Sequence, residues 1–154
     1  MPDSKIPGAP PGPDSAAGVP EGELLYRRLL PGAWYRDPTL VIPQRYFMPR
    51  PWKSDEHPGD TDGISINRAS LTDAVTASRR PDTGEHVPLA EFAAADVYRT
   101  GLSVRCAPLP EDPSHAVIPE LNSAERRDRE KEQKMEEWAL ALRKCSRLIK
   151  PQET

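Results

Sequence analysis

The C-terminal segment from Asn122 to Pro151 constrains the fold more than any other part of the chain. Asn122 with Glu125 three residues later matches an N-cap followed by a capping-box acid, and Pro151 is typical of a helix stop. Helix-forming residues fill most of the interval, which predicts one continuous helix of about seven turns. Its second half carries an apolar stripe with spacings of three and four: Met135, Trp138, Ala139, Leu142, Cys145 and Ile149.

This stripe has to be buried, either on the chain's own domain or on a partner. We take Met135, Trp138, Leu142, Cys145 and Ile149 as candidate partner-binding residues, and the partner expected is another protein. A self-paired helix, and hence a homo-oligomer, is the alternative, although the stripe spans only two heptads. The first half of the helix is polar on all sides, so we expect it to project into solvent.

The whole chain has 154 residues, enough for one small domain plus tails. Of its 19 prolines, six lie in the first twenty residues, so 1–22 is predicted to be a disordered arm. A small domain is expected over 23–120, a charged helix over 121–150 and a short tail over 151–154. Only 36% of the residues are hydrophobic, so the core is marginal and a docked helix would add to its stability.

The pattern of the central region predicts an α+β fold: a small, largely antiparallel sheet with one central helix and the long C-terminal helix. The central helix is expected over 88–101, where Leu89, Phe92 and Val97 share a face. The segment 23–30 fits either one helical face or a buried strand. Short alternating or apolar runs predict strands at 40–42, 44–48, 64–66, 102–106 and 115–118, and a capped helix at 70–75.

Charge and cysteine content exclude several classes of protein. The net charge of −3 gives no general attraction to nucleic acid. From 122 to 150 the chain has nine Lys or Arg and six Asp or Glu, a mixture typical of a solvated face rather than of a phosphate-binding stripe. Its two cysteines form no disulfide framework, no leader opens the chain, and no apolar run approaches the ~20 residues of a membrane span. These observations predict a soluble, cytoplasmic protein without membrane contact.

The histidines offer one candidate site. None has zinc-ligand spacing, so neither a metal nor a cofactor is expected. His115 starts a strand after a loop, where its side chain could face a cleft and form a polar pocket with Arg36 and Arg68. The alternative is structural: His115 hydrogen-bonds the loop and holds the strand in place. We assign no catalytic residue.

Four short motifs follow one another along the domain: Trp34-Tyr35-Arg36-Asp37, Asp62-Gly63-Ile64-Ser65-Ile66, Gly101-Leu102-Ser103-Val104 and His115-Ala116-Val117-Ile118. In this order they resemble a group of small bacterial proteins of uncharacterised function. The resemblance covers roughly Leu24 to Ile118 and implies no activity, cofactor or site. The proline-rich arm and the charged last helix lie outside it.

Three classes of function remain. The first, which we favour, is a non-enzymatic interaction protein, a small adaptor or accessory subunit of a bacterial multi-protein system, that docks through its amphipathic last helix. The second is a small enzyme or toxin of ADP-ribosyltransferase-like type with a pocket near Arg36, Arg68 and His115, although the spacing of such enzymes is not matched. The third is a nucleic-acid-binding accessory, which the acids within the basic helix disfavour.

Overall fold

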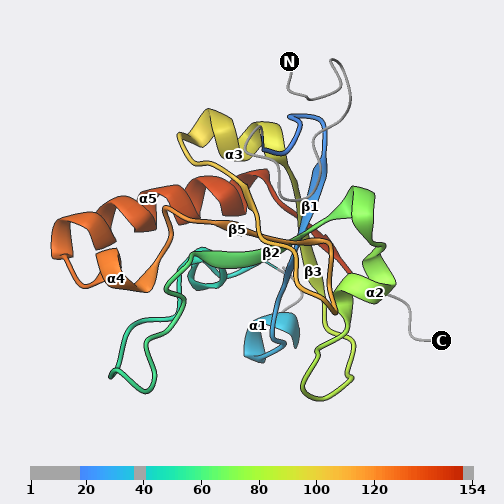
Figure 1. Cartoon of the computed structure of the whole chain (residues 1–154), viewed down its shortest axis with the longest axis horizontal. Coiled ribbons are helices and arrows are strands. Elements are labelled where there is room, and N and C mark those ends of the chain that lie inside the picture. The colour runs from blue at the N-terminus through green and yellow to red at the C-terminus, as the bar shows by residue number, and fades with distance from the viewer. Residues whose placement is uncertain (1–17, 37–40, 151–154) are drawn as a thin grey trace.

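The computed structural model describes residues 18–36 and 41–150, which form one antiparallel sheet in the order β4-β5-β2-β1-β3-β6 with helices around it (Figure 1). This confirms the predicted α+β class with a largely antiparallel sheet and a long C-terminal helix. None of the described helices is both long and apolar enough to cross a membrane. The strands are β1 Leu24–Arg28, β2 Ile64–Arg68, β3 Leu89–Ala93, β4 Arg105–Cys106, β5 His115–Ile118 and β6 Arg147–Ile149. The helices are α1 Ala33–Arg36, α2 Ala74–Ser78, α3 Ala94–Thr100, α4 Ser123–Arg126 and α5 Arg129–Cys145, with 3-10 helices η1 Gln44–Phe47 and η2 Ala69–Leu71.

The main core lies between one face of the sheet and the helices α3, α5 and η1. Strand residues alternate between the two faces, so Leu25 of β1 points into this core. Phe47 of η1 packs edge-to-face on Phe92 of β3, with ring centroids 5.9 Å apart. A smaller cluster on the opposite face joins Tyr26 of β1 to Ala77 of α2. Both faces of the central strand β1 are therefore covered.

The C-terminal segment is two helices rather than the single helix predicted. Asn122 does cap a helix, because its side chain accepts a hydrogen bond from the backbone N–H of Glu125 at 2.9 Å. That helix, α4, ends at Arg126. Asp128 then caps α5 by accepting from the N–H of Lys131 at 3.1 Å. A second N-cap inside the charged run thus restarts the helix.

The end of α5 also differs from the prediction, because the helix stops at Cys145 rather than near Pro151. The chain then turns, and β6 pairs with β3 along the edge of the sheet. Leu148 packs against the main core and Ile149 against the smaller cluster on the opposite face. This alternation is that of a strand, so Ile149 does not belong to the helical stripe.

The helix predicted over 88–101 is a strand followed by a helix, with the change after Ala93. β3 pairs with β1 on one side and β6 on the other, and this pairing overrides the helical spacing of its apolar residues. The strand predicted at 44–48 is the 3-10 helix η1, and the strand predicted at 102–106 covers only 105–106. In both segments the sequence pattern was too short to separate helix, strand and loop.

The structure confirms several other local predictions, at least in part. The strands at 64–66 and 115–118 are confirmed as β2 and β5, and the buried-strand alternative holds for 23–30, which contains β1. The helix predicted at 70–75 begins later, as α2, where the Asp73 side chain accepts from the N–H of Thr76. Of the strand predicted at 40–42, the described positions 41 and 42 are not in a strand, and position 40 lies outside the described residues.

The predicted disordered arm lies outside the described residues over 1–17, as does the predicted tail over 151–154. Residues 18–22 are described, and they are packed against the domain. Val19 is 4% exposed within the main core, and the hydroxyl of Tyr98 on α3 donates a hydrogen bond to its carbonyl. The packed part of the chain therefore begins before the predicted boundary at 23.

Candidate functional site

The three residues predicted to form a polar pocket lie apart. Arg68 is on β2, and its side chain points to the sheet face that holds the main core, where it meets Cys106. His115 on β5 lies beside Asn67, which alternation places on the opposite face. Arg36 is exposed at the end of α1. Within the described part of the chain no hydrogen bond or ion pair joins any two of the three, so the predicted pocket is not formed there.

Arg68 forms a buried ion pair with Glu23. Its Nε and Nη2 atoms donate to the two carboxylate oxygens at 3.1 and 2.8 Å, and the two side chains are only 9% and 6% exposed. Ser70 donates to the same carboxylate from its backbone N–H and its hydroxyl. Burial opposes ionisation of Glu23, but these hydrogen bonds and the charge of Arg68 outweigh it, so the pKa of Glu23 is lowered. The pair is a structural link between the start of β1 and the end of β2.

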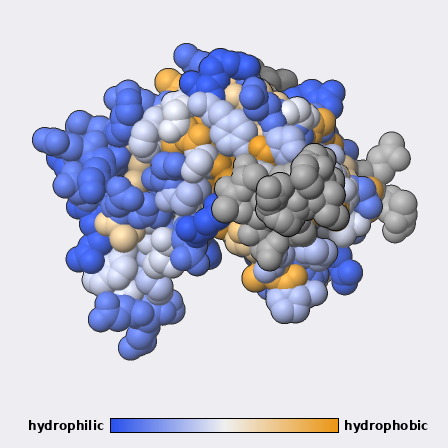
Figure 2. All heavy atoms as spheres, turned by 45° about the horizontal axis from the view of Figure 1, so that its top comes forward, coloured by the Kyte–Doolittle hydropathy of each residue, from blue (hydrophilic) through white to orange (hydrophobic). Residues whose placement is uncertain are grey.

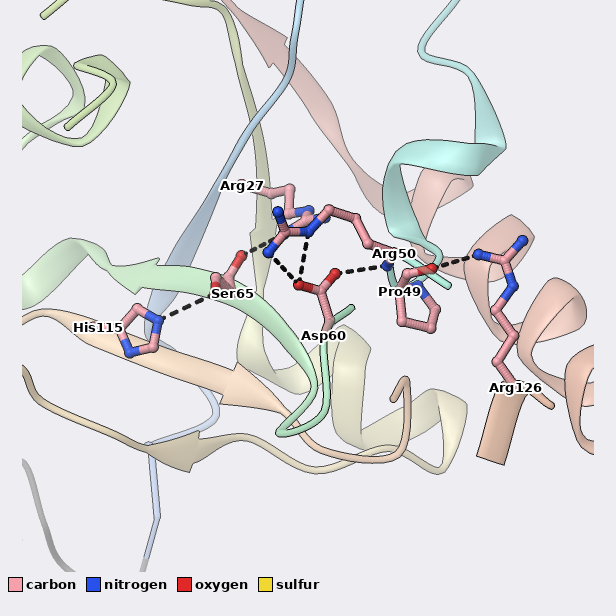
Figure 3. Close-up of polar contacts among 7 residues, drawn as sticks. All are labelled: Arg27, Pro49, Arg50, Asp60, Ser65, His115 and Arg126. Atoms are coloured by element: carbon pink, nitrogen blue, oxygen red, sulfur yellow. Dashed lines mark hydrogen bonds and ion pairs between the residues drawn. The ribbon is translucent and has the colours of Figure 1, made fainter. Parts of the chain in front are cut away.

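His115 has both ring nitrogens engaged within the fold. Nδ1 donates to the carbonyl of Ala107 at 2.8 Å, because a carbonyl can only accept. Nε2 lies within hydrogen-bond distance of the hydroxyl of Ser65, at 3.2 Å (Figure 3). The ring therefore ties the loop before β5 to the middle of β2, which matches the structural alternative considered for this residue.

The stripe proposed as a partner-binding surface is docked on the chain's own domain. Met135 and Leu142 are 1% and 0% exposed in the main core, where α5 packs against η1, α3 and β3. Trp138 is half-buried at the edge of this core, whereas Cys145 is exposed and Ile149 is on β6. The buried members are thus not an open surface. The charged start of α5 is exposed, and Figure 2 shows hydrophilic residues over this end of the molecule.

A cleft of about 550 Å³ brings together arginines that are scattered along the sequence. It lies where β1 ends, and its walls come from η1, the loop after η1, the loop after α2, and α4. The described residues that line it include no Asp or Glu and six arginines: Arg27, Arg28, Arg45, Arg50, Arg80 and Arg126. The other lining residues are mainly apolar: Leu30, Tyr46, Met48, Pro49, Pro51 and Pro81. The cleft therefore combines positive charge with an apolar wall.

Arg27 is more deeply buried than its neighbour Arg28, and Figure 3 shows it beside Ser65. Its Nε donates to the carbonyl of Tyr46 at 2.9 Å, and its Nη1 donates to the carbonyl of Ser65 at 2.8 Å. Burial lowers the pKa of Arg27 to about 10, and the nearby carboxylate of Asp60 opposes this shift. Arg27 therefore remains charged at neutral pH, and its hydrogen bonds to η1 and β2 fix the position of that charge.

Three of the arginines contact carboxylates that lie outside the lining of the cleft. The nitrogen–oxygen distances are 2.9 Å for Arg50–Asp60, 2.7 Å for Arg80–Asp82 and 2.9 Å for Arg126–Glu132. Arg126 also donates to the carbonyl of Pro49 (Figure 3). These contacts hold the three arginines in place and pair each of them with one negative charge.

The described contacts of the other cleft arginines are with neutral groups. Arg28 donates from Nη1 to the carbonyl of Ala77 at 3.2 Å, and the guanidinium of Arg45 lies 4.9 Å from the ring centroid of Tyr46. Burial lowers the pKa of Arg28, as it does that of Arg27. In the cleft and its immediate surroundings, positive charge therefore exceeds negative charge.

This arrangement is suited to binding an anion rather than to catalysing a reaction. Guanidinium groups present forked donors that match carboxylates and phosphates. They stay protonated near neutral pH, so they do not serve as general bases there. Over 18–36 and 41–150, no group of three His, Cys, Asp or Glu side chains is placed to hold a metal ion.

Sequence reasoning missed the cleft because its arginines come from four separate parts of the chain. One local signal was available. Arg27 and Arg28 interrupt the apolar run of β1, and alternation places Arg27 on the same face as Leu25. A guanidinium on a core-facing position has to find hydrogen-bond partners, which predicts a polar site at that end of the strand.

Comparisons of the chain with protein-family models, with curated proteins and with solved structures found no match. The resemblance to a group of small bacterial proteins therefore stays a prediction. Inference about function rests on the geometry of the cleft.

Proposed function

We propose that this chain is a non-enzymatic interaction protein, a small adaptor or accessory subunit, that binds an anionic partner in the arginine-lined cleft. The observation that carries the proposal is the lining itself, with six arginines and no carboxylate among its described residues. A concave site with an excess of positive charge attracts an anionic ligand and concentrates it. The proposal keeps the function expected from the sequence but moves the binding surface from α5 to the cleft.

The other lining residues support a binding site for a partner. Arginine, tyrosine and methionine are enriched at interfaces, and Tyr46 and Met48 lie among the cleft arginines. Desolvated arginines such as Arg27 interact with an anion more strongly than fully hydrated ones, because water screens the charge less. Arg27 is already held by two backbone carbonyls, so its charge is positioned before the partner arrives.

The proposal is tested by the affinity for poly-L-glutamate, measured by titration calorimetry. Arg28→Ala with Arg45→Ala removes two charges from the cleft, and we expect it to weaken binding by at least about tenfold. Arg99→Ala with Arg105→Ala removes two exposed charges outside the lining and serves as the matched control. Thermal melting of both variants checks that each is folded.

If both double variants lose the same affinity for poly-L-glutamate, the polymer is attracted by positive residues anywhere on the surface, and the proposal is wrong. Wild-type protein that does not bind poly-L-glutamate at low salt would also contradict it. Binding by the wild type should fall as salt is raised, since exposed charges are screened over about 8–10 Å at physiological ionic strength.

A further inference from the structure

A second cavity, of about 520 Å³, shares lining residues with the arginine-lined cleft. Arg50 and Pro51 line both, so the two cavities meet along one short stretch of chain. The charged residues among the described lining of the second cavity are two cations, Arg50 and Lys53, and one acid, Glu56. The two cavities are therefore neighbours, and we call them together the basic groove.

The loop that forms the second cavity is held in a defined shape. The N–H of Lys53 donates to the carbonyl of His57 at 2.9 Å, and the N–H of Asp60 donates to the carbonyl of Arg50 at 3.2 Å. Gly59 closes the loop at φ +77°, and a Cβ there would lie 2.2 Å from the carbonyl oxygen of Arg50. Only glycine fits this position without strain, so the sequence is adapted to the loop closure.

We infer that the occupant of the basic groove is an extended acidic peptide of a partner protein, with apolar residues between its carboxylates. This inference rests on the proposed function and adds the class of partner. An extended peptide rises about 3.3 Å per residue and turns successive side chains to opposite sides. Carboxylates on one side then reach the guanidinium groups, while apolar side chains between them contact the proline- and methionine-lined wall.

The apolar wall favours a peptide over a nucleic acid. Single-stranded nucleic acids bind largely by stacking bases on open aromatic rings. The Tyr46 ring is instead covered by Arg45, and its centroid lies 5.6 Å from that of Trp34. Trp52, next to Pro51, has the guanidinium of Arg127 4.0 Å from its ring centroid. The rings of Tyr46 and Trp52 are thus already contacted by arginines of this chain.

The prolines also define how a peptide would be held. Proline lacks a backbone N–H, so Pro49, Pro51 and Pro58 offer no backbone donor to an added strand. Recognition has to come from side chains, and the forked donors of arginine supply it with bidentate geometry. A ligand with several carboxylates fits this better than one with a single charge.

The test uses the full chain and three anionic probes of equal length, followed by fluorescence anisotropy. They are a peptide of about twelve residues repeating Glu-Pro-Glu-Leu, an all-glutamate peptide and a deoxythymidine oligonucleotide. We expect the mixed peptide to bind at least about fivefold more tightly than either of the others. Lys53→Ala should weaken its binding severalfold, while Lys134→Ala, on α5 outside both cavities, should leave it unchanged.

The outcomes separate this inference from the proposed function. Tightest binding of the oligonucleotide, lost in the Arg28→Ala/Arg45→Ala variant, would overturn the peptide inference and leave anion binding in place. Equal affinity for the mixed and all-glutamate peptides would overturn the role of the apolar wall. An unchanged affinity in Lys53→Ala would overturn the extension into the second cavity. If no probe binds, the proposed function fails and the inference fails with it.

Discussion

Replacing Arg68 by methionine should destabilise the protein strongly, although Arg68 does not line the cleft. The change removes one partner of an ion pair whose side chains are 9% and 6% exposed. Glu23 would be left buried, with Ser70 as its described remaining donor. Breaking a buried pair by deleting one member costs about 3–5 kcal/mol, because the other charge stays desolvated. A small domain has about 5–15 kcal/mol in all, so this loss is a large share.

The assay is urea unfolding at neutral pH followed by tryptophan fluorescence. Glu23→Gln combined with Arg68→Met removes both charges, and its free energy of unfolding should exceed that of Arg68→Met alone by at least about 1.5 kcal/mol. If Arg68→Met lowers the free energy of unfolding by less than about 1 kcal/mol, the pair contributes no more than an exposed ion pair does, and the reasoning is refuted. A double variant whose loss equals the sum of the two single losses would also refute it, since the charges would then not be coupled.

Three further predictions concern pH, the core and the groove. The hydrogen-bonded carboxylate of Glu23 has a lowered pKa in the folded chain, so the stability it gives is complete above its ordinary pKa of 4.5 and is lost as pH falls through the lowered value. Unfolding free energies measured from pH 7 down to pH 3 should show a smaller fall in Glu23→Gln than in the wild type; parallel curves would contradict this. Leu142→Ala should cost about 2–5 kcal/mol in urea unfolding, because the side chain is fully buried, and a loss below about 1 kcal/mol would mean that α5 is loosely docked. Gly59→Ala should lower stability by at least about 1 kcal/mol and weaken binding of the acidic peptide, whereas Gly22→Ala, with open space around it, should do neither.

The fold class and several strands could be predicted because their patterns are local. Ile64 and Ile66 alternate with polar residues, as a half-buried strand requires, and Asn122 is a cap whose partner lies three residues away. The break between α4 and α5 was missed because Asp128 is one acid among many charges, and a cap cannot be told from a surface acid without its geometry. Leu148 and Ile149 continue the helical spacing, and only pairing with β3 makes them a strand.

The site was less predictable than the fold, for a physical reason. Arg27 and Arg126 are about a hundred positions apart in the sequence, and they line one cleft because the sheet brings the end of β1 close to α4. The spacing of residues along the sequence does not predict which distant residues come together in the fold. The residues that sequence reasoning selected, Arg68 and His115, are polar groups on strands, and both have their hydrogen bonds satisfied within the fold. A polar residue on a buried strand needs a hydrogen-bonding group nearby. The sequence does not show whether that group belongs to the same chain or to a ligand.

The energetics of α5 explain why a binding function is better placed in the cleft than on the helix stripe. Met135 and Leu142 are fully buried in the main core, and exposing such a side chain costs about 1.5–3 kcal/mol. A partner that used this face would first have to lift the helix from its own domain, and its affinity would be reduced by the sum of those costs. The cleft requires no such opening, because its arginines are held by carbonyls and carboxylates while an open volume of about 550 Å³ lies between them. With only 36% hydrophobic residues, the chain uses the long apolar stripe of α5 for its own core.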